Sequence, residues 1–136
     1  MMIKMFNSAF EMSLRIICAL SASSEPLSVE KIQIIDFIAT YGKDFGLAEL
    51  NLHGDNAYKK GEIYARNVLI SSTIKEMVLE GLVEFIATKE GFRYRLSKNG
   101  LALFGMLNDE YAYEYSKIAK ELVKKTEYEL NRIVQK

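Results

Sequence analysis

The chain has 136 residues, of which 49% are hydrophobic and 26% are charged, and its 18 basic residues balance 18 acidic ones. These values exclude an intrinsically disordered chain, which needs lower hydrophobicity or a large net charge. They also exclude an overall positive field that attracts nucleic acid, so any DNA contact must come from a local patch.

The N-terminal part of the chain predicts one helix. Ser8 and Glu11 have the spacing of a capping box, in which the two side chains satisfy free amides at a helix start. Apolar residues then recur at a helical period to about Ala22. Pro26 follows, and proline cannot continue the amide ladder, so we expect the helix to end before it.

A second helix and a long connection come next. Ser28 is a natural N-cap, and the apolar period after it predicts a helix that continues to Tyr41. The helical spacing of apolar residues then ends, and a mostly polar stretch follows from Gly46 to about Gly61. A connection of this length is more often functional than a short one.

The next segments predict a helix and a hairpin. The third helix should run from about Glu62 to Glu80, with apolar faces that include Val68, and Gly81 stands where a left-handed C-cap belongs. Two strands are expected at 82–87 and 92–96, joined by a turn of hairpin length.

Two further helices complete the chain. Ser97 is expected to cap a short fourth helix that ends near Leu107. Asn108 and the acidic residues after it start a fifth helix, since acids suit the positive end of a helix. That helix is expected to continue without a break to Gln135.

The order helix, hairpin, helix from Thr73 to Phe104 is similar to the wing region of many bacterial winged-helix proteins. The sequence therefore predicts an α+β, predominantly helical fold: a winged helix-turn-helix core with a two-stranded wing, plus N-terminal and C-terminal helices. We expect a winged-helix domain over residues 1–107 and a C-terminal helix over residues 108–136, which packs on the domain or on a partner. This scaffold serves both DNA readers and adaptors, so the fold alone does not define the function.

A DNA-reading winged helix places its third helix in the major groove and its wing on phosphate. The candidate contacts are polar and basic side chains of these two elements: Arg66, Asn67, Ser71, Lys75, Lys89, Arg93 and Arg95. From Tyr58 to Gly105 eight basic residues stand against five acidic ones, an excess of only three, which is modest for a base reader. The strand arginines could equally keep the outer face of the hairpin hydrated and guard it against edge pairing.

Three segments, Met5–Glu11, Ile35–Gly46 and Asn51–Asn56, resemble the small middle component of bacterial ABC-three-component systems. The resemblance implies a winged-helix subunit that works with a Rad50- or SMC-like ATPase and a separate effector, in conflict with phages or plasmids. It further implies a non-catalytic adaptor that binds the ATPase, the effector or DNA. The alternative is a homodimeric winged-helix DNA-binding transcription regulator that dimerises through its C-terminal helix.

Candidate contacts with a protein partner lie in the long connection, shortly before it, and in a run of tyrosines: Tyr41, Asp44, His53, Asp55, Tyr111, Tyr113 and Tyr115. Tyrosine is enriched at interfaces because it buries a large area yet tolerates water. Two alternatives remain open. The tyrosines could instead pack on the first helix of the domain, and the polar residues of the connection could simply fix its turns.

The chain offers little that indicates an enzyme. His53 is the only histidine, so a metal site built on paired histidines cannot form within one chain. Cys18 is the only cysteine, which excludes an internal disulfide, and its apolar helical setting is that of a buried core residue. We expect no catalysis, cofactor or metal. The start resembles no signal peptide and no apolar run reaches about 20 residues, so we expect a cytoplasmic protein without membrane contact.

Overall fold

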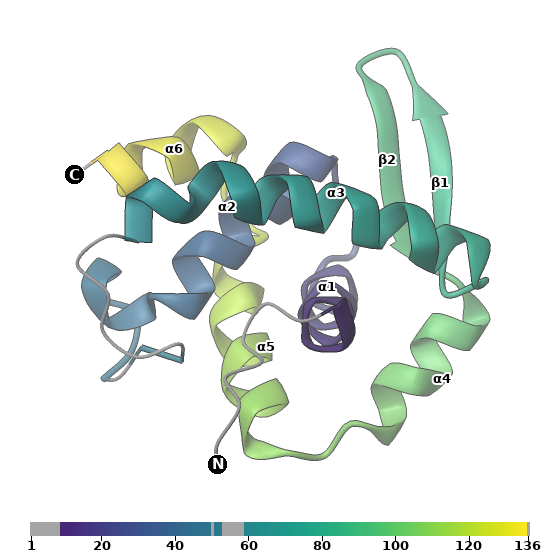
Figure 1. Cartoon of the computed structure of the whole chain (residues 1–136), viewed down its shortest axis with the longest axis horizontal. Helices are drawn as coiled ribbons and strands as arrows, with labels where there is room; N and C mark the ends of the chain where they lie inside the picture. The colour runs from purple at the N-terminus through teal and green to yellow at the C-terminus, as the bar shows by residue number, and fades with distance from the viewer. Residues whose placement is uncertain (1–8, 50, 53–58, 136) are drawn as a thin grey trace.

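The computed structural model describes residues 9–49, 51–52 and 59–135, and 68% of the chain is helical. The described elements, in chain order, are six α-helices, two short 3-10 helices and one hairpin: α1 (Ala9–Ala22), α2 (Val29–Thr40), η1 (Gly42–Phe45), η2 (Lys59–Glu62), α3 (Ile63–Leu79), β1 (Val83–Thr88), β2 (Gly91–Leu96), α4 (Lys98–Met106), α5 (Glu110–Leu122) and α6 (Glu127–Gln135) (Figure 1).

Helix α1 forms the centre of the molecule, and α2, α3, α4 and α5 lie around it (Figure 1). Seven of its residues are buried, and they face in several directions around its axis. A helix that is apolar on most sides belongs in the interior. The core around it draws on every α-helix except α4 for fully buried residues, including Ile118 and Leu122 of α5 and Leu130 of α6. The C-terminal segment therefore packs on the chain's own domain.

The predicted wing is present as an antiparallel hairpin in which Val83 pairs with Leu96 and Thr88 with Gly91. Leu27, before α2, exchanges two backbone hydrogen bonds with Tyr94, so β2 is paired on both sides at this point. Gly81 has a φ of 80° after α3, the left-handed conformation expected of a glycine C-cap. These features confirm the predicted α+β, predominantly helical fold class, with a winged-helix-like layout.

Two predicted caps are confirmed and one helix is corrected. The hydroxyls of Ser28 and Ser97 accept hydrogen bonds from backbone N–H groups at the starts of α2 and α4. The prediction of a single C-terminal helix is wrong, because the helix is interrupted between Leu122 and Glu127 and forms two helices, α5 and α6. The Thr126 hydroxyl accepts from the N–H of Glu129, whose carboxylate accepts from the N–H of Thr126, which is a capping box that starts a new helix.

Candidate functional site

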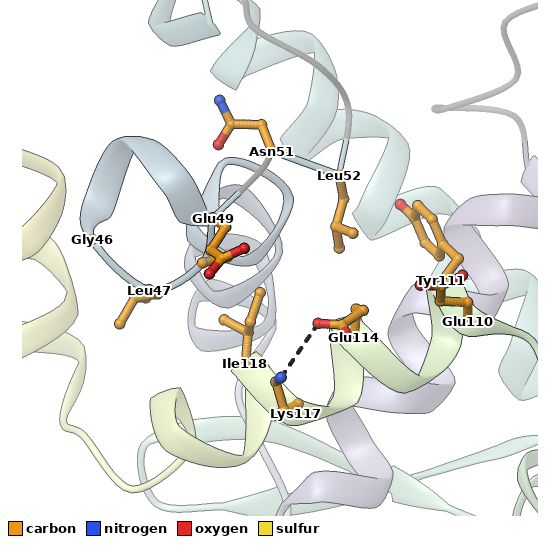
Figure 2. A pocket seen from close by; sticks show the side chains of 11 residues that line it. Gly46, Leu47, Glu49, Asn51, Leu52, Glu110, Tyr111, Glu114, Lys117 and Ile118 are labelled. Carbon is orange, nitrogen blue, oxygen red and sulfur yellow. Dashed lines mark ion pairs between the residues drawn. The ribbon is translucent and has the colours of Figure 1, made fainter.

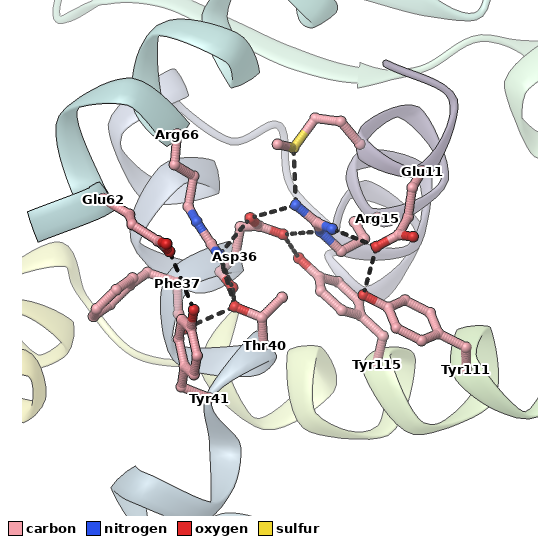
Figure 3. A network of polar contacts seen from close by, with 11 residues as sticks. Glu11, Arg15, Asp36, Phe37, Thr40, Tyr41, Glu62, Arg66, Tyr111 and Tyr115 are labelled. Carbon is pink, nitrogen blue, oxygen red and sulfur yellow. Dashed lines mark hydrogen bonds and ion pairs between the residues drawn. The ribbon is translucent and has the colours of Figure 1, made fainter. Parts of the chain in front are cut away.

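A network of charged and hydroxyl groups lies inside the protein, centred on Asp36 of α2 (Figure 3). Arg15 of α1 donates to both carboxylate oxygens, with Nε 2.7 Å from Oδ1 and Nη2 3.2 Å from Oδ2. Arg66 of α3 donates from Nη1 to Oδ2 at 3.2 Å, and the Tyr115 hydroxyl of α5 donates to Oδ1 at 2.7 Å. One carboxylate thus joins side chains from three other helices.

Further polar groups accept hydrogen bonds from the two arginines. Arg66 Nη1 also donates to Thr40 Oγ1 at 2.7 Å. Arg15 Nη1 donates to the Glu11 carboxylate at 2.8 Å, and the Tyr111 hydroxyl donates to the same oxygen at 3.3 Å. Buried charges are tolerated only when they are paired and hydrogen-bonded, so these additional hydrogen bonds help to stabilise the network.

The electrostatics of the network favour one fixed protonation state. Burial alone raises the pKa of Asp36, but the guanidinium groups of Arg15 and Arg66 outweigh it and hold that pKa below its usual value. Burial, together with the Asp36 charge, raises the pKa of Tyr115 well above its usual value. Asp36 therefore stays ionised and Tyr115 stays protonated across the physiological range. The network ties α1, α2, α3 and α5 together.

The structure corrects three of the predicted contact residues, because their side chains lie in the interior. Arg66 is 3% exposed, Tyr41 is 2% exposed and Tyr115 is 1% exposed. Arg66 lies against the ring of Tyr41, whose hydroxyl donates to Glu62 at 3.3 Å. Side chains at this depth cannot reach DNA or a protein partner in this conformation, and their role is to hold the fold.

A broad open hollow lies between the connection after η1 and helix α5 (Figure 2). Its volume is about 990 Å³, and it is lined by residues of two segments: Gly46, Leu47, Ala48, Glu49, Asn51 and Leu52 from the connection, and Glu110, Tyr111, Glu114, Lys117 and Ile118 from α5. Among the residues that the structure describes, its charged lining is three carboxylates and one ammonium, and Lys117 pairs with Glu114 at 3.5 Å. The described part of the lining therefore carries an excess of negative charge.

Asn51 shapes this hollow, although the sequence did not single it out. Its carboxamide oxygen accepts from the backbone N–H of Lys43 and Asp44, and its Nδ2 donates to the Asp44 carboxylate at 3.0 Å. These hydrogen bonds hold the connection at Asn51 against η1. The only signal in the sequence was that both residue types bond readily to local backbone.

The other predicted partner contacts occupy different settings. Tyr113 is 66% exposed on α5, with the Lys117 ammonium 6.0 Å from its ring centre. Tyr111 is half-buried, and it both lines the hollow and takes part in the internal network. His53 and Asp55 lie outside the described residues, so their predicted role stays a prediction.

The remaining predicted DNA contacts lie on α3 and the wing, but they form no dense basic patch. Lys75 and Lys89 are exposed, whereas Asn67 and Arg93 are half-buried. The Ser71 hydroxyl is half-buried and accepts from Gln33 Nε2 at 3.1 Å. Arg95 is exposed and pairs with Glu84 at 3.0 Å, so its charge is partly neutralised.

Large apolar side chains share this surface: Tyr64, Val68 and Leu79 on α3, and Phe85 and Phe92 on the wing. Val68, predicted on an apolar face of the third helix, is 52% exposed. An exposed apolar patch of this kind is typical of a protein interaction site.

Two general findings apply to the residues that the structure describes. No three His, Cys, Asp or Glu side chains among them gather as metal ligands would. None of the described helices combines the length and apolar character needed to cross a bilayer.

Together the fold and these surfaces define a class: a small, mostly helical chain with a two-stranded wing, an internal charge network and apolar and acidic exposed areas. The chain belongs to the family described as ABC-three component (ABC-3C) system Middle Component 2, whose family model matches residues 5–136. This confirms the resemblance drawn from the three sequence segments. Neither a curated protein nor a solved structure matches the chain.

Proposed function

We propose that this chain is a non-catalytic adaptor that links a Rad50- or SMC-like ATPase to an effector in a bacterial anti-phage or anti-plasmid system. The observation that carries the proposal is the family match over residues 5–136, which makes the chain one component of a multi-component system. The internal network supports the non-catalytic part. Its arginines and carboxylates neutralise one another within the core, where they hold helices rather than face a substrate.

The hollow between the connection and α5 is the surface we assign to the ATPase. It is broad, its lining mixes apolar and charged side chains, and its acidic residues Glu49, Glu110 and Glu114 favour a basic segment of the partner. Complementary charge of this kind speeds encounter and sets specificity. Tyr113 lies on the same helix and is exposed, as interface tyrosines commonly are.

The surface of α3 favours an adaptor over a DNA-reading regulator. Arg66, one of the two side chains suited to base readout at the front of this helix, is committed to Asp36 in the core. The exposed positions Tyr64, Val68 and Leu79 are apolar, whereas DNA-binding surfaces are polar and strongly positive. Any contact with DNA is therefore expected to be weak and independent of sequence.

Charge reversal at the hollow tests the proposal. The variant Glu49→Lys/Glu110→Lys should bind the ATPase of its own system at least about tenfold more weakly, a loss of about 1.4 kcal/mol. The matched control is Glu25→Lys/Glu30→Lys, which makes the same charge change at exposed positions. Glu30 lies in the first turn of α2, as Glu110 does in α5, so both variants perturb one helix start. Equal affinity for the two variants would remove the hollow from the interface.

A further inference from the structure

The charges that line the hollow beside α5 are only partly neutralised within the described part of the chain (Figure 2). Glu114 pairs with Lys117 at 3.5 Å, whereas Glu49 and Glu110 are exposed and form no ion pair with a described residue. The apolar part of the lining includes Leu47, Leu52 and Ile118. A segment that fits this lining therefore combines apolar side chains with a small number of positive charges.

The residues that precede α1 in the sequence, here called the N-terminal segment (residues 1–8), have this composition. Its apolar residues are Met1, Met2, Ile3, Met5 and Phe6. Lys4 is its only charged residue. The Lys4 ammonium suits the carboxylates of the hollow, and the apolar side chains gain free energy by leaving water for the apolar lining. The N-terminal segment thus complements the hollow in both charge and hydrophobicity.

The N-terminal segment also joins the domain beside the hollow. Helix α1 starts at Ala9, and two residues later Glu11 accepts a hydrogen bond from the Tyr111 hydroxyl at 3.3 Å (Figure 3). Tyr111 itself lines the hollow. The part of α5 that lines it, from Glu110 to Ile118, is about 12 Å long at 1.5 Å per residue. Eight extended residues reach about 26–29 Å, so the segment is long enough to cross the hollow.

We propose that the N-terminal segment occupies the hollow and is displaced when the ATPase binds there. This inference rests on the proposed function, in which the hollow binds a basic segment of the ATPase. Because the N-terminal segment is part of the same chain, its effective concentration at the hollow is on the order of 1 mM. Even with an intrinsic dissociation constant of about 0.1 mM it covers the hollow about nine-tenths of the time, which weakens the apparent affinity for the ATPase about tenfold. The segment is therefore an autoinhibitory element.

A disulfide test of the full chain needs no ATPase, so its result does not depend on the proposed function. Ile3→Cys/Leu47→Cys should form a disulfide within one chain under mild oxidation, since Leu47 lines the hollow and is 37% exposed. The matched control is Ile3→Cys/Leu101→Cys, whose second cysteine lies at a 54% exposed position of α4, a helix that also packs on α1. Native Cys18 is buried, and burial raises the pKa of its thiol, so it does not compete. Equal rates for the two pairs, measured by non-reducing electrophoresis, would overturn the inference.

The charge of Lys4 is tested in the same assay. Lys4→Gln in the Ile3→Cys/Leu47→Cys chain should slow the cross-link severalfold, because the ammonium no longer attracts the segment to the acidic lining. Lys98→Gln removes the same charge at an exposed position of α4 and should leave the rate unchanged. Equal effects of the two substitutions would contradict a contact between Lys4 and the hollow.

Binding of the ATPase of the same system tests the autoinhibition itself. Deletion of residues 2–7, which keeps Met1, should tighten binding about tenfold. Unchanged affinity after this deletion would overturn the inference. Glu49→Lys/Glu110→Lys in the shortened chain separates this failure from a failure of the proposed function. If the charge reversal still weakens binding, the hollow remains the ATPase site and only the autoinhibition is wrong, whereas no effect would remove both.

Discussion

Replacing Asp36 by alanine should cost about 3–5 kcal/mol of unfolding free energy, the usual cost of removing one partner from a buried ion pair. The carboxylate lies 2.7 Å from Arg15 Nε, 3.2 Å from Arg66 Nη1 and 2.7 Å from the Tyr115 hydroxyl. Its removal takes away the carboxylate that both buried guanidinium groups face. Since a domain is stable by only about 5–15 kcal/mol, the variant should lose a large part of its stability.

Urea unfolding followed by far-ultraviolet circular dichroism measures this loss, since the chain has no tryptophan for fluorescence. The matched control is Glu84→Ala, which removes a carboxylate 3.0 Å from Arg95 in a pair whose side chains are 58% and 51% exposed. An exposed pair contributes about 0–1 kcal/mol, so this variant should unfold almost as the wild type does. Similar losses in the two variants would refute the structural role of the network.

Three further predictions concern stability and DNA. Gly100→Ala should destabilise the chain by more than about 2 kcal/mol, because the added Cβ meets the Leu82 backbone carbonyl. Gly105→Ala in the same helix is the control: its Cβ meets nothing within 4 Å, and the variant should be more stable by about 0.5–1 kcal/mol. Urea unfolding measures both changes. The pKa of Asp36 is lower in the folded than in the unfolded chain, so this carboxylate should stabilise the fold fully at pH values above its unfolded pKa near 3.9. The stabilisation should be lost as the pH falls below that value. In Asp36→Asn the free energy of unfolding should therefore depend less on pH in this range. Burial raises the pKa of Glu11, so protonation of this carboxyl favours the folded chain. The total loss of stability at acid pH should therefore be somewhat smaller than Asp36 alone would cause. Duplex DNA of random sequence should bind weakly, and a plot of log affinity against log salt concentration should have a slope no steeper than about −4. Tight binding of one defined DNA sequence by the isolated chain would contradict this and favour a transcription regulator.

Most of the fold could be predicted from the sequence because its signals are local. The caps Ser28 and Ser97 and the C-cap Gly81 each act within one turn of their own helix, and the structure confirms all three. The break between α5 and α6 was missed although Thr126 and Glu129 form a capping box, because the apolar period continues across it.

The roles of individual charged residues could not be predicted in the same way. Arg66 and Asp36 are 30 positions apart, and only the packing of α2 on α3 brings them to 3.2 Å. An arginine on a predicted recognition helix is most simply interpreted as a DNA contact, since sequence does not show which side of the helix is covered. Val68 shows the same limit for an apolar residue: the sequence predicts that it lies on an apolar face of the third helix, and that position is exposed.

The adaptor role itself is tested most directly by reconstitution of the three components. The ATPase and the effector of the same system are mixed with and without this chain, and the ATPase is captured by a tag. We predict that the effector is retained only when the chain is present, and that Glu49→Lys/Glu110→Lys abolishes this retention while Glu25→Lys/Glu30→Lys does not. Retention of the effector by the ATPase in the absence of this chain would contradict the account.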